Sequence, residues 1–209
     1  MSTPHFIFDF ETIGQSIFKA PIVNCAYTIF DWERFTSDKP YTFDELVDQI
    51  KFDKLDVEFQ VREQGCVIKQ SDLKWWMDQG PLAFKQIRPS INDLQPDDFI
   101  TNLITYIGAA KLNRWWSRSN CFDPVLLQRA VEASSKYSMK DINKILPFWQ
   151  LRDTRTFIDT RFNFTLKYNT FCPYEDQAEW DKVFVKHYSP HDVAADILRM
   201  QKIEQIIKG

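Results

Sequence analysis

Long apolar runs are absent from this sequence of 209 residues. No stretch approaches the roughly 18 apolar residues that a membrane-spanning helix requires. The N-terminal segment also lacks the basic residues and the apolar run of a signal peptide. These absences argue against a membrane or secreted protein, and we expect a soluble protein of the cytoplasm.

Cysteine is scarce, and its four copies lie far apart at Cys25, Cys66, Cys121 and Cys172. The sequence has no C-x-x-C pair and no dense cysteine pattern, so it predicts neither a disulfide framework nor a zinc site. Reduced thiols are the expectation, in agreement with a cytoplasmic protein.

A general excess of positive charge is also lacking, because the formal net charge is −3. A protein that coats nucleic acid without specificity would carry a broad basic surface, so this class is disfavoured. A nuclease remains compatible with the charge, since an enzyme that holds only a few nucleotides can use bound cations to offset an acidic site.

Apolar residues are present in sufficient number for one sizeable core, with 44% hydrophobic and 15% aromatic residues. The length of 209 residues falls within the ~50–250 residues of typical domains. The sequence shows no internal repeat, low-complexity segment or linker. Residues 1–209 are therefore predicted to form a single domain.

The N-terminal part is predicted to form an antiparallel meander. Residues 6–8 are a short apolar run typical of a buried strand, and residues 21–31 are a second β-rich run. A third strand is predicted within residues 41–52, although residues 44–47 are equally compatible with a helix.

Helices and strands alternate in the rest of the chain. Capping residues and helical spacing predict helices that begin near Ser71, Pro81 and Pro96. The remaining predicted elements are strands at 113–119 and 148–153, helices at 123–133, 154–162 and 191–207, and an irregular segment at 163–180. This order indicates an α/β fold with a mixed sheet.

Asp9 and Glu11 follow the first apolar run directly. Residues i and i+2 of a strand share one face, so both carboxylates would project side by side. Their mutual repulsion would be removed by a divalent cation such as Mg²⁺ or Mn²⁺, which prefers oxygen ligands. An ordinary surface or capping pair is the alternative, although a strand end is where ligands bind in α/β folds.

A second group of polar residues opens the last predicted helix, in the segment from His191 to Asp196. His191 follows Pro190 and is expected to lean from the turn over a site to which Asp196 contributes a ligand. Asp192 shares a helix face with Asp196. The alternative for Asp192 is an acidic residue that stabilises the helix dipole.

Asp123 stands between the predicted strand at 113–119 and the following helix. An Asp before Pro124 is a favourable N-cap with proline in the first turn, which is the structural alternative to a site residue.

Together, the three groups resemble the DEDDh exonucleases, whose pattern is D-x-E, then F-D, then H-x-x-x-x-D. This superfamily includes the proofreading subunits of DNA polymerases, RNase T and oligoribonuclease. The matching residues in this chain are Asp9, Glu11, Phe122-Asp123, His191 and Asp196. The resemblance implies an RNase H-like mixed β-sheet flanked by helices.

The resemblance extends to the exonuclease A family of T-even-type phages, from about residue 6 to residue 200. The shared motifs are Phe8-Asp9-Phe10-Glu11-Thr12, Thr42-Phe43-Asp44-Glu45-Leu46, Trp75-Trp76 with Gln79, Phe148-Trp149 with Arg152-Asp153-Thr154-Arg155-Thr156, and His191-Asp192 with Asp196-Ile197-Leu198. Bacterial exoribonucleases with the same tryptophan pair also look similar.

By resemblance, the site holds two ions of Mg²⁺ or Mn²⁺ and His191 is the general base. Asp9 bridges both ions, Glu11 and Asp196 hold the ion on the nucleophile side, and Asp123 acts through metal-bound water. Two ions ~3.5–4 Å apart stabilise the attacking and leaving oxygens of an in-line displacement. The expected products are nucleoside 5′-monophosphates released from nucleic acid 3′ ends.

The terminal nucleotide also requires a pocket, for which the predicted substrate-binding residues are Phe10, Thr12, Ile13, Trp75 and Trp76. An aromatic side chain that stacks on a base contributes ~1–3 kcal/mol. Adjacent residues of a helix point ~100° apart, so one tryptophan is expected to face the cleft and the other the core, or both the core.

Three functions are compatible with these motifs. A DNA exonuclease is favoured by the phage-type match, in which case the compartment is the host cytoplasm if the chain is phage-encoded. An exoribonuclease that acts on short or overhanging RNA is the alternative, since the motifs do not report on tolerance of the 2′-OH. An inactive binding module is disfavoured, because such a protein should have lost one or more of the carboxylates.

Overall fold

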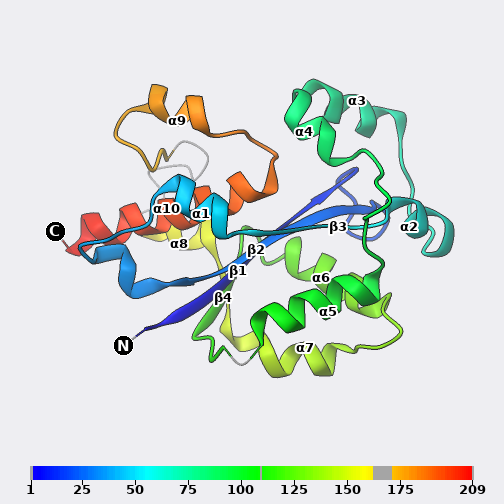
Figure 1. Ribbon diagram of the computed structural model, residues 1–209, viewed down its shortest axis with the longest axis horizontal. Helices are drawn as coiled ribbons and strands as arrows, with labels where there is room; N and C mark the ends of the chain where they lie inside the picture. The colour runs from blue at the N-terminus through cyan, green and yellow to red at the C-terminus, as the bar shows by residue number, and fades with distance from the viewer. Residues whose placement is uncertain (1, 109, 162–170, 209) are drawn as a thin grey trace.

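A computed structural model describes residues 2–108, 110–161 and 171–208 (Figure 1). Its centre is a five-stranded mixed sheet in the order β3-β2-β1-β4-β5. β1 (Pro4–Thr12), β2 (Ile22–Asp31) and β3 (Lys51–Lys54) form the antiparallel part. β4 (Arg114–Ser117) runs parallel to β1, and β5 (Leu151–Asp153) runs parallel to β4. The predicted α/β class and mixed sheet are confirmed.

The central strand β1 is buried on both faces, and its side chains alternate between two cores. Phe6, Phe8 and Phe10 join one core with the helices on their side of the sheet. Ile7 joins the other core with residues of the last helix. Because the strand is central, the acidic residues near its end are also held inside the molecule.

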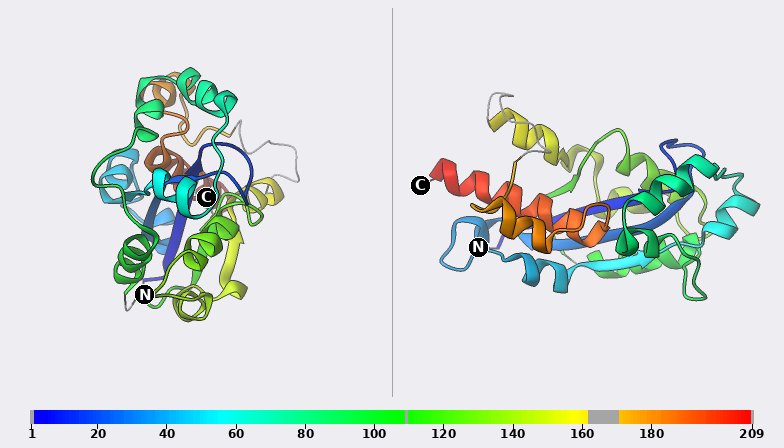
Figure 2. Two further views of the ribbon diagram at one scale, coloured as in Figure 1. Left: turned by 90° about the vertical axis from the view of Figure 1, so that its right-hand side faces the viewer. Right: turned by 90° about the horizontal axis from the view of Figure 1, so that it is seen from above.

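Helices cover both faces of the sheet (Figures 1 and 2). One face is covered by α5 (Pro96–Ile107), α6 (Asp123–Glu132) and α7 (Met139–Ile145). The long helix α10 (Ser189–Lys208) lies across the other face and packs against α1 (Phe43–Gln49) and α8 (Thr154–Arg161). α9 (Gln177–Val183) lies on the same side as α10.

Two short helices, α3 (Gln70–Asp78) and α4 (Pro81–Gln86), form a unit at the end towards which β1 points (Figure 1). Trp76, Ala83 and Ile87 of this unit pack on Ile13 and Val23, next to the turn between β1 and β2. α2 (Val57–Glu63) precedes the pair. The helical unit therefore stands beside the acidic end of β1.

Several elements differ from the sequence-based expectation. Within residues 41–52 the helical alternative is the correct one, because Thr42 caps α1 by accepting a hydrogen bond from the backbone N–H of Glu45. The third strand of the antiparallel part, β3, begins after this helix, at Lys51. The predicted strand at 148–153 begins with the 3₁₀ turn η2 (Phe148–Gln150), and another, η1 (Trp32–Thr36), follows β2.

Three further helices, α2, α7 and α9, were not predicted. α7 has a recognisable signal in its sequence, a capping box formed by Ser138 and Asp141. α9 begins within the segment expected to be irregular, residues 163–180, of which 163–170 lie outside the described residues. Within the described ranges, no helix is both long and apolar enough to span a bilayer.

Candidate active site

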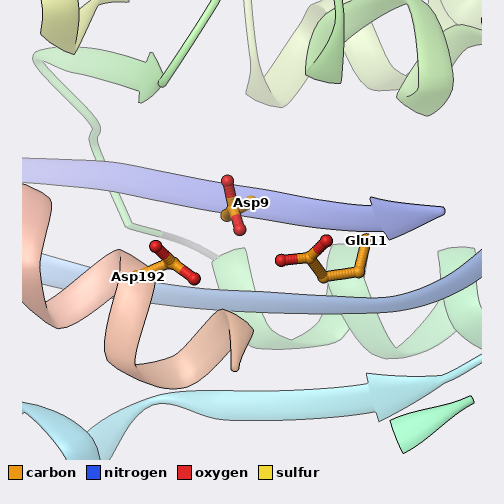
Figure 3. Close-up of side chains that lie close together, drawn as sticks. All are labelled: Asp9, Glu11 and Asp192. Atoms are coloured by element: carbon orange, nitrogen blue, oxygen red, sulfur yellow. The ribbon is translucent and has the colours of Figure 1, made fainter. Parts of the chain in front are cut away.

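Three carboxylates meet where β1 ends and α10 begins (Figure 3). Asp9, Glu11 and Asp192 each present an oxygen, and these oxygens lie within 4.8 Å of one another. Asp9 and Glu11 share a face of β1 because every second residue of a strand points to the same side. Asp192 points at them from the first turn of α10. We call these three residues the acidic group.

Two members of the acidic group are buried, since Asp9 is 7% exposed and Asp192 is 3% exposed, and the side chain of Glu11 is 13% exposed. Burial raises the pKa of both Asp9 and Glu11 well above the ordinary value, and neighbouring carboxylates raise it further. Arg118 acts in the opposite direction for both residues. The positive charge of Arg118 thus partly offsets the negative charge of more than one carboxylate.

Asp192 has a buried oxygen that a bound cation would satisfy. Its Oδ1 accepts a hydrogen bond from Arg118 Nη1 at 2.9 Å, but its Oδ2 is buried with no hydrogen-bond partner among the described residues. An unsatisfied buried carboxylate oxygen is unfavourable. Oxygen donors at this spacing suit a hard divalent ion such as Mg²⁺ or Mn²⁺.

Asp123 lies close to the acidic group without belonging to it. The N-cap of α6 is Phe122, so Asp123 is the first residue of the helix and does not cap it. Its Oδ1 instead accepts a hydrogen bond from the backbone N–H of Phe10 at 3.1 Å. Burial raises the pKa of Asp123 to about 6, and the charge of Asp123 contributes to the raised pKa of Asp9.

Asp196 lies one helical turn beyond Asp192 and has other partners. Its carboxylate accepts hydrogen bonds from Arg118 Nε at 3.2 Å and from Thr154 Oγ1 at 3.1 Å. Arg199 Nη1 approaches it at 3.4 Å. The charge of Asp196 is therefore compensated by arginines, and the structure does not bring this predicted ligand into the acidic group.

His191, the predicted base, lies in an aromatic environment. Its Nδ1 accepts a hydrogen bond from the backbone N–H of Val185 at 3.0 Å. Its ring packs edge-on against Phe43 and Tyr188, with centroids 5.0 and 4.8 Å apart. These contacts favour a packing role.

His187 is the histidine that the structure places beside the acidic group. Its Nδ1 lies 4.0 Å from Glu11 Oε1, and its ring packs edge-on against Trp75 at 4.8 Å. Burial lowers its pKa, while the charge of Asp192 raises it, so the neutral form that can accept a proton is favoured near neutral pH.

His187 was assigned no role from the sequence, although a signal was present. The spacing H-x-x-x-x-D occurs twice, as His187 with Asp192 and as His191 with Asp196. The helix was expected to begin at His191, but α10 begins at Ser189. The earlier start places Asp192 in the first turn and His187 in the preceding loop.

The predicted substrate contacts divide into exposed and buried side chains. Phe10, Ile13 and Trp76 are 3%, 2% and 0% exposed, so their burial favours packing over contact with a substrate. Trp76 Nε1 also donates a hydrogen bond to the backbone carbonyl of Thr12 at 3.1 Å. Trp75 is 45% exposed and stands next to His187, which makes it the tryptophan that faces solvent at the site.

Thr12 is the remaining predicted contact, and it is 8% exposed at the end of β1. Its hydroxyl donates a hydrogen bond to the backbone carbonyl of Gly14 at 2.7 Å. This bond stabilises the start of the turn that follows Glu11.

Comparisons with known proteins agree with the expected family. Residues 4–187 match the model of the 3′-5′ exoribonuclease Rv2179c-like domain. The chain is 34% identical over 210 residues to the exodeoxyribonuclease of Enterobacteria phage T4, covering 94% of this chain and 87% of the phage protein. The expected resemblance to phage exonucleases is confirmed.

Solved structures show the same fold at low sequence identity. Pop2p of S. pombe, in a form with Mg²⁺ and Mn²⁺ bound, has a TM-score of 0.57 at 15% identity over 99% of this chain and 83% of that one. E. coli exonuclease I in complex with a dT13 oligonucleotide has a TM-score of 0.55 at 12% identity over 99% of this chain. The chain spans only 41% of exonuclease I. The chain has an RNase H-like fold and belongs to the family of 3′-5′ exoribonuclease Rv2179c-like domains.

Proposed function

We propose that this protein is a metal-dependent exonuclease that removes nucleoside 5′-monophosphates from the 3′ ends of DNA. The observation that carries the proposal is the acidic group, three carboxylates with oxygens within 4.8 Å of one another at a strand end. Membership in an exonuclease family and the similarity to the T4 exodeoxyribonuclease support it. The retained carboxylates argue against an inactive binding module.

Asp9, Glu11 and Asp192 would hold two ions of Mg²⁺ or Mn²⁺, with Asp123 beside them. When bound, such ions stabilise the charge on the attacking and leaving oxygens of a phosphodiester. The chain itself supplies a rigid set of ligands, since strand and helix fix the three carboxylates before any ion arrives. Arg118 keeps Asp192 oriented through its hydrogen bond to Oδ1.

His187 is our proposal for the general base that takes the proton of the attacking water. The assignment of this role to His191, and of a metal ligand to Asp196, remains the sequence-based prediction. The geometry favours His187, which lies 4.0 Å from Glu11, over His191, whose Nδ1 is already hydrogen-bonded. Trp75 would stack on the terminal base from the exposed side of the same site.

An exoribonuclease is the second candidate, and the description of the matching family as 3′-5′ exoribonuclease favours it. The two activities need the same ligands and the same base. They differ in whether the site tolerates the 2′-OH of the substrate.

A single assay tests both candidates. Single-stranded DNA and RNA oligomers with a 5′ label are incubated with the protein in Mn²⁺ or in EDTA. We expect a ladder of shortened DNA in Mn²⁺ only, and none with Asp9→Ala, whose fold is checked by circular dichroism. Shortening of RNA alone would favour the second candidate, and metal-dependent shortening of neither would refute both.

A further inference from the structure

His187 has an unusual backbone conformation. Among the described residues it is the only non-glycine residue with a positive φ, which is 60°. The left-handed region is uncommon for residues other than glycine, and the surrounding structure must enforce it. The conformation of the turn that carries His187 must therefore be stabilised by contacts with other parts of the chain.

A chain of three buried polar side chains provides this restraint. Ser189 Oγ donates to Asn24 Oδ1 at 2.6 Å, and Asn24 Nδ2 donates to Gln86 Oε1 at 3.1 Å. Gln86 Nε2 then donates to the backbone carbonyl of His187 in a short hydrogen bond. The chain begins and ends in the same turn, and we call it the 187–189 staple.

The orientation of each amide in the staple is determined by its ends. A backbone carbonyl can only accept, so Gln86 must present its nitrogen to His187 and its oxygen to Asn24. Asn24 must then present its oxygen to the hydroxyl of Ser189. Asn24, Gln86 and Ser189 are 0%, 4% and 0% exposed, so water does not compete for these bonds.

The staple also relates His187 to the acidic group. Asn24 stands directly opposite Glu11 in the antiparallel pairing of β1 and β2. Asn24, the central residue of the staple, is therefore the residue of β2 that pairs with Glu11. A displacement of the 187–189 turn away from Glu11 would therefore disturb these buried hydrogen bonds.

We propose that Gln86, together with Asn24 and Ser189, is a positioning residue that sets the distance between the His187 ring and the acidic group. This inference rests on the proposed role of His187. Among the described residues, the hydrogen bonds of the Gln86 side chain go to Asn24, Ala83 and His187 and not to the acidic group, so we expect its effect on the proton transfer step. Misplacement of a reacting group by about 1 Å can cost roughly a hundredfold in rate.

The test compares Gln86→Met with Gln201→Met. Gln201 is a matched control because it is a buried glutamine, 6% exposed, whose amide bonds the backbone N–H and carbonyl of Tyr41. For Gln86→Met we expect kcat to fall about 10- to 100-fold. KM should stay within about twofold of the wild-type value. The dissociation constant for Mn²⁺, measured by titration calorimetry, should also stay within about twofold. Gln201→Met should lower the unfolding midpoint similarly and leave kcat within the same margin.

A double-mutant cycle with His187→Ala separates positioning from general destabilisation. If Gln86 acts through His187, Gln86→Met should have little further effect on kcat once the imidazole is absent. Ser189→Ala opens the other end of the staple and provides a milder variant if Gln86→Met does not fold; it should lower kcat by a smaller factor.

The possible failures are distinguishable. A wild-type protein that shortens no oligomer refutes the proposed function, and the inference with it. An active wild type with unchanged kcat in both Gln86→Met and Ser189→Ala refutes the inference alone. So does an equal loss of kcat in Gln201→Met, or full additivity with His187→Ala.

Discussion

The two histidine–aspartate pairs at the start of α10 have the same spacing and opposite surroundings. His187 and Asp192 meet the carboxylates of β1, and Asp192 has a buried oxygen without a hydrogen-bond partner among the described residues. His191 and Asp196 are satisfied by a backbone N–H, aromatic rings, a hydroxyl and arginines. The buried oxygen of Asp192 that lacks a hydrogen-bond partner therefore distinguishes the pair His187 and Asp192, which we propose as catalytic, from the pair His191 and Asp196.

The largest difference is expected between Asp192→Asn and Asp196→Asn. Loss of a metal-ligating carboxylate should remove several kcal/mol of transition-state stabilisation, which is roughly a thousandfold in kcat. Asp196→Asn should keep activity within about tenfold, because its partners are arginines and a hydroxyl. The assay is shortening of labelled oligomers in Mn²⁺. Equal losses of kcat in the two variants would contradict the proposed difference between Asp192 and Asp196.

The second difference is expected between His187→Ala and His191→Ala. Removal of a general base typically costs about 10²–10⁴-fold, and we expect this loss in kcat for His187→Ala only. His191→Ala should instead lower the unfolding midpoint, since it removes ring packing against Phe43 and Tyr188. The reverse pattern of kcat values would restore His191 as the base.

A smaller effect is expected from the tryptophan pair, which shows the same contrast between neighbours. Trp75→Ala should raise KM about tenfold, since stacking on a base contributes ~1–3 kcal/mol, with no change in unfolding midpoint. Trp76→Ala should destabilise the fold by about 3–5 kcal/mol because its side chain is completely buried. Unaltered KM values in Trp75→Ala would exclude it from the substrate site.

The smallest effect concerns stability as a function of pH without added metal. Burial raises the pKa of Asp9 and Glu11, and raises that of Asp123 to about 6. The folded protein keeps protons that the unfolded chain loses near pH ~4, so this contribution is present below that pH and is lost as pH rises through the raised values.

In EDTA, the unfolding midpoint should therefore decrease between about pH 5 and pH 8 by several degrees. Added Mg²⁺ should recover more of it at the higher pH, where the carboxylates are charged. Asp192→Asn should weaken this recovery, whereas Asp196→Asn should retain it. An identical Mg²⁺ effect at both pH values would contradict a carboxylate metal site.

The local signals in the sequence were sufficient for many of the elements. The apolar run before Asp9 predicted β1, the spacing after Pro96 predicted α5, and the D-x-E pair placed two carboxylates on one face of a strand. These features depend on neighbours within a few residues, which is why they can be read directly. The segment of α1 was ambiguous because its sequence is compatible with a strand and with a helix. In the structure, the Thr42 side chain caps the helix.

The sequence by itself determined the family, the mixed sheet and Asp9 with Glu11 as an acidic pair at a strand end. Tertiary structure alone decided which repeat of H-x-x-x-x-D faces that pair, because the answer depends on where α10 begins and on how it crosses the sheet. It also decided that Trp75 is exposed and Trp76 buried, and that Asn24, Gln86 and Ser189 meet around His187. Residues this far apart in the chain share no local pattern, and only the packing of α4 and α10 on β2 brings them within hydrogen-bonding distance.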